Sequence, residues 1–197
     1  MLADIEVEKL RASDKAELIE LFVQAFEEHP LIPALGSKPE MARPGMDAFL
    51  SCFGGAESAV AYGIRGEGKL ISAALCLDAS EEPPQPALLQ LVLFLTRVAG
   101  WDVVKELEVI AKEEPKYQDR YLEVLMLGTL PLYQKQGLGR RVLRFLYDEA
   151  KRLDYKGLTL LADCNTPAYQ LYLKEGFIVD REFTVGETTL CWMRLTF

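Results

Sequence analysis

The chain has 197 residues, half of them hydrophobic, and a formal net charge of −8 at pH 7. This length and composition suit one sizeable core, so we expect residues 1–197 to form a single folded domain. The negative charge repels phosphates and anionic lipid surfaces, which argues against nucleic acid and membrane partners and favours a cationic one.

The first residues are acidic where an export signal would be basic and then apolar, so no export signal is expected. The longest apolar run, residues 87–95, is too short to span a bilayer, and we expect a cytoplasmic protein. His29 is the one histidine and is expected at a helix end rather than in a Ser-His-Asp or Cys-His site. The four cysteines form no CxxC pair, which predicts buried thiols and neither a metal site nor a disulfide. They are Cys52, Cys76, Cys164 and Cys191.

In chain order, the hydrophobic pattern predicts a strand over 5–10, a helix over 14–28, a short helix over 46–53, and paired strands over 58–65 and 70–78. The proline-rich loop EEPPQP follows at residues 81–86. Residues 87–113 then have the periodicity of two helices. We expect them to form a helical insertion, about residues 80–118, between the third and fourth strands.

The second half of the chain alternates between strand and helix. Residues 121–130 are apolar on both faces, as in a strand buried in the middle of a sheet, and Glu123 is their only charge. The predicted elements that follow are an amphipathic helix over 137–153, a strand over 157–162, a helix over 166–175 and a hairpin over 177–197. The order β-α-β-α-β-β predicts a fold in which helices cover a sheet.

A glycine-rich turn, Q-x-x-G-x-G, joins the buried strand to the amphipathic helix through Gln134, Gly137 and Gly139. Glycine has no Cβ, so an anion can approach the backbone, and the unpaired N–H groups of a helix start attract negative charge. Lys135 and Gln136, with Gln134, supply donors at the rim. The turn suits a phosphate group; the alternative is a turn that only starts a helix. A Walker loop and a Rossmann fingerprint are both excluded by the spacing.

This turn resembles motif A of the GNAT acetyltransferase superfamily, whose members wrap the pyrophosphate of acetyl-coenzyme A (acetyl-CoA) with backbone N–H groups. Downstream, NTPAYQLYLKEGF, residues 165–177, resembles motif B of that family, N-x-x-A-x-x-L-Y-x-K-x-G-F. The resemblance covers about residues 121–197. It implies the α+β GNAT fold, a central, mixed and twisted sheet of six or seven strands flanked by helices. It also implies acetyl-CoA as co-substrate, with no metal.

The same resemblance assigns one catalytic role, and the residues themselves suggest a second. Tyr172 lies seven positions after Asn165, about two helical turns, and is the implied proton donor to the departing thiolate. The alternative is that Tyr172, like Tyr169, is a packing residue. Glu123 is the candidate base for the amine proton, directly or through water, because burial in an apolar strand raises a carboxyl pKa. The alternatives are an ion-paired glutamate and a water chain that acts as the base.

The coenzyme contacts follow from motif position. A backbone N–H for the oxyanion is expected around residues 127–129, with a bulge at Gly128. Asn165 is expected to contact the pantetheine chain or a water, and N-capping of the helix at Asn165 or Thr166 is the alternative. Arg140 is expected near the phosphates. The coenzyme-binding residues are then expected to be Leu127, Gly128, Thr129, Gln134, Lys135, Gln136, Gly137, Leu138, Gly139, Arg140 and Asn165.

Together these features predict an N-acetyltransferase that moves the acetyl group of acetyl-CoA to a primary amine of a small molecule or peptide, by direct attack in a ternary complex. The alternative is a catalytically silent acyl-CoA-binding module that regulates or scaffolds. Residues 29–53 and the insertion set the acceptor, and no motif is legible there. Homodimerisation through the insertion helices or the last strand stays open.

Overall fold

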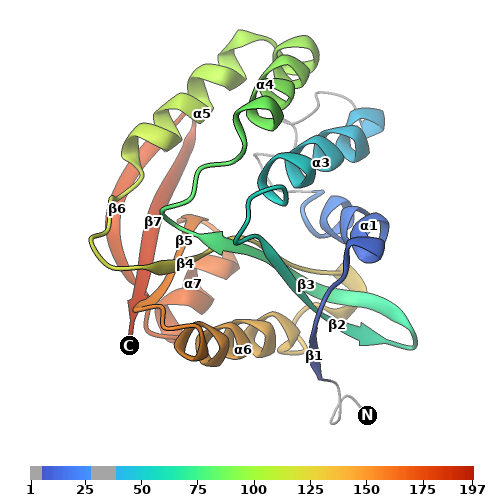
Figure 1. The fold of residues 1–197 in the computed structure, drawn as a ribbon, viewed down its shortest axis with the longest axis vertical. Helices are drawn as coiled ribbons and strands as arrows, with labels where there is room; N and C mark the ends of the chain where they lie inside the picture. The colour runs from blue at the N-terminus through green and yellow to red at the C-terminus, as the bar shows by residue number, and fades with distance from the viewer. Residues whose placement is uncertain (1–5, 28–38) are drawn as a thin grey trace.

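In the computed structural model, residues 6–27 and 39–197 are described, and they form one seven-stranded sheet with helices on both faces (Figure 1). The strands lie in the order β1-β2-β3-β4-β5-β7-β6. Only β4 and β5 run parallel, which confirms the predicted mixed sheet. The strands are β1 (Val7–Lys9), β2 (Val60–Gly66), β3 (Lys69–Asp78), β4 (Tyr121–Thr129), β5 (Gly157–Asp163), β6 (Ile178–Val185) and β7 (Thr188–Thr196).

The helices of the described residues are α1 (Lys15–Ala25), α3 (Pro39–Phe53), α4 (Gln85–Ala99), α5 (Trp101–Glu113), α6 (Leu138–Arg152) and α7 (Pro167–Lys174), with 3-10 turns η1 (Ala12–Asp14) and η2 (Pro131–Tyr133). Helices α4 and α5 lie between β3 and β4, which confirms the predicted insertion. Helix α3 starts earlier than the predicted 46–53. Within the described ranges, no helix combines the length and apolar character that a membrane crossing needs. His29 lies outside the described residues.

Helices α6 and α7 pack on one face of the sheet, and α1 and α3 pack on the other. Helix α6 is amphipathic, and its apolar stripe faces the sheet because these positions recur at helical spacing. The buried residues of this stripe are Leu138, Val142, Leu143, Leu146 and Ala150. Helix α4 extends the other layer, since Leu91 and Leu95 pack with Cys52 of α3. In Figure 1, α1, α3, α4 and α5 form an arc over one side of the sheet and α6 lies on the other.

Helix α1 comes very close to β4 at Gly128. A Cβ atom built on Gly128 would lie 3.0 Å from the Cβ of Ala25 and 3.0 Å from the Cδ1 of Phe22. Gly128 itself pairs in register with Ala73 of β3, so no bulge occurs there. The prediction of a bulge at Gly128 is wrong, because the glycine serves the close packing of a helix and not a break in the ladder.

Two of the cysteines form a disulfide, so the prediction of buried thiols alone is wrong. Cys164, directly after β5, is joined to Cys191 of β7, and their Cα atoms lie 6.1 Å apart. The two residues are 27 positions apart in the sequence, and the antiparallel pairing of β5 with β7 brings them together. Sequence spacing carries no sign of this pairing. Cys52 and Cys76 are free and buried, as predicted.

Candidate active site

The parallel pair β4–β5 opens partway along its length. Residues 121–123 pair with residues 157–159, and the ladder then stops. Residues 124–129 continue to pair with β3, and residues 160–163 continue to pair with β7. On the sides that face each other, these two segments have no strand partner among the described residues. Backbone N–H and C=O groups need hydrogen-bond partners, so the opening suits an extended ligand that lies between the strands.

The ladder between β3 and β4 has its irregularity beside this opening. Leu75 pairs with Met126 and Cys76 pairs with Val124, which leaves Leu125 as the extra residue on β4. A bulge re-aims the backbone groups around it, and bulges are frequent at functional sites. The bulge that the sequence placed at Gly128 is therefore at Leu125, where β4 begins to run apart from β5.

The glycine turn before α6 is open. Gly137 is the N-cap residue with φ 81° and ψ 6°, and within the described part of the chain no side chain caps the helix. A Cβ built on Gly137 would meet nothing within 4 Å, and one on Gly139 would meet only the Thr129 hydroxyl, at 3.6 Å. The first N–H groups of α6, at residues 138–140, have no helix carbonyl to donate to, and the described residues leave room around the two glycines. With the helix dipole, they form a site for an anion.

The polar side chains of the turn hold the loop. Gln134 donates from Nε2 to the Thr129 carbonyl at 3.2 Å, and Gln136 donates from Nε2 to the Leu132 carbonyl at 3.2 Å. Lys135 is exposed and adopts φ 59°, a left-handed conformation. Two of the predicted rim donors, the side-chain amides of Gln134 and Gln136, therefore hold the conformation of the loop through these hydrogen bonds.

Arg140 is bound to another protein group. Its Nε lies 2.8 Å from Oε1 of Glu175, and Arg144 Nε lies 3.0 Å from Oε2 of the same carboxylate. Glu175 follows α7, so this pair of contacts ties the start of α6 to the end of α7. Sequence reasoning placed the Arg140 guanidinium at the phosphates and missed Glu175. The Arg140 guanidinium is thus held by Glu175, and its backbone N–H is one of the first N–H groups of α6.

Glu123 occupies the last position at which β4 and β5 are paired, with Thr159 as its register partner. Its neighbours Leu122 and Val124 belong to the core under α6, so strand alternation directs Glu123 to the opposite face. The side chain is buried, and burial raises the pKa of Glu123 to about 8, with a further contribution from the charge of Glu114. No ion pair involves Glu123 within the described ranges, so the ion-paired alternative lacks a partner there.

Tyr172 belongs to the core on the α6 side. Only 8% of the residue is exposed, and its ring centroid lies 5.7 Å from that of Phe177. Burial raises the pKa of Tyr172 to about 12. Tyr172 and Glu123 therefore approach the sheet from opposite faces, and the opening between β4 and β5 lies between those faces.

The start of α7 resolves one of the alternatives for Asn165. Thr166 is the N-cap residue, and its hydroxyl accepts from the Tyr169 N–H at 3.4 Å. Asn165 is exposed and its N–H donates to Oδ1 of Asp163 at 2.8 Å. Because Thr166 performs the capping, the Asn165 side chain is left available for another contact.

The sequence did not single out the loop that leads from α5 into β4. The Tyr117 hydroxyl donates to Oδ2 of Asp180 at 2.8 Å and lies 3.1 Å from the Thr159 hydroxyl. This loop also contains Glu114, whose charge acts on Glu123. These residues have no motif around them, and only the strand register brings them to the face on which Glu123 lies.

The open parallel pair and the glycine turn at the start of α6 suit an extended ligand that carries a phosphate group. The sequence profile of the acetyltransferase (GNAT) family matches residues 45–177, which is more than half of the chain. The chain belongs to this family, and it is an acetyltransferase of the GNAT type. No curated protein sequence matches the chain.

Solved structures share the fold. A polyamine N-acetyltransferase of Drosophila melanogaster, described as catalysing the formation of N-acetylagmatine, superposes with a TM-score of 0.71 at 15% identity, over 98% of this chain and 100% of that one. A Corynebacterium glutamicum protein described as histone acetyltransferase HPA2 and related acetyltransferase gives 0.67 at 17% identity, over 96% and 94%. Arabidopsis thaliana NAA60, in complex with acetyl-CoA, gives 0.57 at 14% identity, over 98% of each.

Proposed function

We propose that this protein is an N-acetyltransferase that moves the acetyl group of acetyl-CoA to a primary amine of a small molecule or peptide, by direct attack in a ternary complex. The observation that carries the proposal is the pairing of two features. The Gly137 turn starts α6 with no side-chain cap from the described residues, and it lies beside the end of β4 that is not paired with β5. A Cβ built on Gly139 would come 3.6 Å from the hydroxyl of Thr129. A diphosphate at the turn and a pantetheine chain in the opening would satisfy both sets of backbone groups.

The residues that would hold the coenzyme divide by position. Residues 137–140 would bind the diphosphate through their N–H groups, and residues 127–129 would contact the ligand from β4, where that strand is not paired with β5. Asn165, which is exposed just before α7, would contact the pantetheine chain. A backbone N–H of residues 124–129, which include the predicted 127–129, would serve the oxyanion of the tetrahedral intermediate, because β4 has no partner there on the β5 side.

Glu123 suits the base. An alkylammonium has a pKa of about 10.4, and the nitrogen must lose a proton before its lone pair can attack. A carboxyl group whose pKa is about 8 is a much stronger base than an ordinary carboxylate, and a fraction of it is ionised at neutral pH. The negative charges of Glu114 and of the chain as a whole favour a cationic acceptor on this face.

Tyr172 suits a hydrogen-bond donor to the departing sulfur better than a full proton donor. A thiol has a pKa of about 8.5, so transfer of a proton from a phenol at about 12 to the thiolate would be uphill by about 5 kcal/mol. Such a phenol stays protonated through the neutral range, and its O–H can stabilise the developing negative charge.

Calorimetry with acetyl-CoA, followed by thiol-release assays over a panel of polyamines, amino acids and peptide N-termini, tests the proposal. Tyr172→Phe should lower kcat by about 100-fold while the Kd for acetyl-CoA changes little, and Tyr169→Phe is the matched control. Tight binding with no turnover on any amine would instead support a catalytically silent acyl-CoA-binding module. Absence of binding would contradict both functions.

A further inference from the structure

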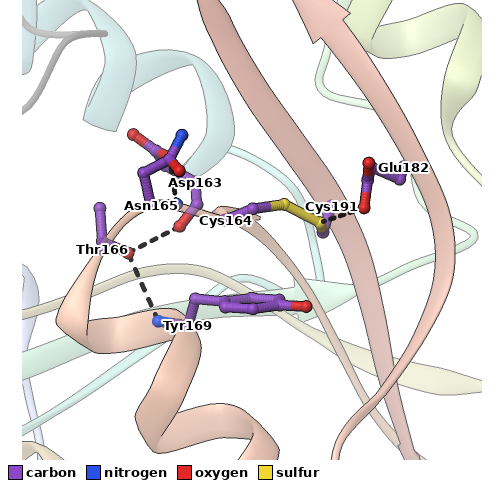
Figure 2. The surroundings of a disulfide bond; sticks show 7 residues. All are labelled: Asp163, Cys164, Asn165, Thr166, Tyr169, Glu182 and Cys191. Carbon is purple, nitrogen blue, oxygen red and sulfur yellow. Dashed lines mark hydrogen bonds between the residues drawn. A yellow bond between two sulfur atoms is a disulfide. The ribbon is translucent and has the colours of Figure 1, made fainter.

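The disulfide lies where the β5 strand leaves the opening and the motif B helix begins. Cys164 follows the last residue of β5, and its N–H donates to the Thr189 carbonyl of β7 at 3.0 Å. Figure 2 shows the bridge running from the turn at Cys164 to Cys191, with the ring of Tyr169 alongside it. The turn is otherwise held by Thr166, whose hydroxyl donates to the Asp163 carbonyl at 2.7 Å.

The two cysteine residues are unequally exposed. Cys191 has no exposed surface and belongs to the core under α6 and α7, whereas Cys164 is half-buried and packs at the edge of that core. An attacking thiolate must reach the sulfur along the bond axis, so accessibility decides which sulfur is attacked. Cys164 is the residue of the pair with exposed surface, so we infer that its sulfur is the one attacked. The sulfur of Cys191 is then the one that leaves as a thiolate and later re-forms the bond.

When the bond is reduced, the thiol of Cys191 has a hydrogen-bond acceptor nearby. Its Sγ lies 4.0 Å from Oε2 of Glu182 on β6, within the range of a hydrogen bond to sulfur (Figure 2). The Cα separation of 6.1 Å falls in the ordinary range for a disulfide, so closing the bond requires no displacement of the strands. The same backbone conformation can thus hold the two cysteines either as thiols or as a disulfide. Although Glu182 and the two cysteines are grouped like metal ligands, the bonded sulfurs offer no thiolate to a cation.

We propose that Cys164 is a thiol-exchange site for a low-molecular-weight alkyl thiol of the coenzyme A or glutathione kind. A thiolate attacks Sγ of Cys164, a mixed disulfide forms, and Cys191 leaves as a thiolate and takes a proton. A second thiol attacks the mixed disulfide, which releases the small symmetrical disulfide and the Cys164 thiol. The sum is one protein disulfide and two thiols converted to two protein thiols and one small disulfide. The reverse sequence, with the small disulfide as oxidant, closes the bond.

The exchange is measured by counting thiols on the folded wild-type protein, with no reference to acetyl transfer. Protein purified without reductant is incubated with coenzyme A or, in a parallel arm, glutathione, then quenched in acid, denatured and alkylated for peptide mass mapping. Two alkylated cysteines, Cys52 and Cys76, are expected before incubation, and four are expected afterwards. Acid-trapped intermediates should have the adduct on Cys164 at least about tenfold more often than on Cys191, because Cys164 is partly exposed and Cys191 is fully buried.

Cys191→Ala gives a second measurement, since it leaves Cys164 without its partner. Incubated with the small disulfide, this variant should accumulate one stable adduct at Cys164, and Cys76→Ala, the matched control at a buried free thiol, should behave as wild type. A faster reaction with coenzyme A than with glutathione would identify coenzyme A as the natural thiol. Equal rates would identify low-molecular-weight alkyl thiols in general as the reactants. Four alkylated cysteines before incubation, a bond that resists both thiols in the folded protein, or an adduct on Cys191 would each overturn the proposal.

Discussion

Replacing Glu123 with glutamine should change how the stability of the protein depends on pH. In the unfolded chain the carboxyl has its ordinary pKa of about 4.5, whereas in the folded protein burial and the charge of Glu114 raise it to about 8. Between these values the folded state keeps a proton that the unfolded state has lost, so stability falls as the pH rises. Below pH 4.5 Glu123 causes no loss of stability, and above pH 8 the loss that it causes no longer changes with pH.

The size of the effect follows from the two pKa values. Each pH unit inside the window costs about 1.4 kcal/mol, so this one group should lower the wild-type free energy of unfolding by about 2.5 kcal/mol between pH 5 and pH 7. Glu123→Gln cannot ionise and should lack this fall. All other titrating groups are common to both proteins, so the difference between their unfolding free energies isolates Glu123.

Urea unfolding at pH 5, 7 and 9 measures this difference, with exposed Glu187→Gln as the control that should follow the wild type. Glu114→Gln adds a sharper test, because loss of its negative charge should lower the pKa of Glu123 and move the window to lower pH. In thiol-release assays, the rising limb of kcat/KM near pH 8 should disappear in Glu123→Gln. Parallel stability curves for wild type and Glu123→Gln would refute a carboxyl held protonated by burial.

Three further predictions concern the glycines and the disulfide. Gly137→Ala must adopt φ 81°, which should cost about 1–2 kcal/mol in urea unfolding and weaken acetyl-CoA binding in calorimetry; an unchanged Kd would argue against an anion at this turn. Gly128→Ala places its Cβ 3.0 Å from Ala25 and should cost about 1–3 kcal/mol, and an unchanged Tm would mean that α1 can shift. Reducing the Cys164–Cys191 bond, which closes a loop of 27 residues, should lower the free energy of unfolding by about 3.5 kcal/mol, and identical urea curves with and without reductant would contradict a closed bond.

Local patterns were enough to predict most of the elements. Helix α6 follows from apolar residues at helical spacing, and β4 follows from a run that is apolar on both faces, because these periodicities reflect how side chains leave a helix or a strand. The glycine turn could be recognised equally well, since the missing Cβ that lets an anion approach the backbone is a property of glycine itself. The positive φ of Gly137 was known only from the structure. The sequence predicted that the N-cap residue of α7 is Asn165 or Thr166, and the structure shows that it is Thr166.

Strand register and contacts across the sheet could not be predicted from local patterns. The bulge at Leu125, the bond between Cys164 and Cys191, and the ion pairs of Glu175 with Arg140 and Arg144 all join residues far apart in the chain. The sequence by itself determined which segments are strands and helices and that one turn suits an anion, because those properties depend on neighbours along the chain. Only the tertiary structure decided where β4 and β5 separate and which groups face that opening, because pairing energies depend on which strands lie side by side.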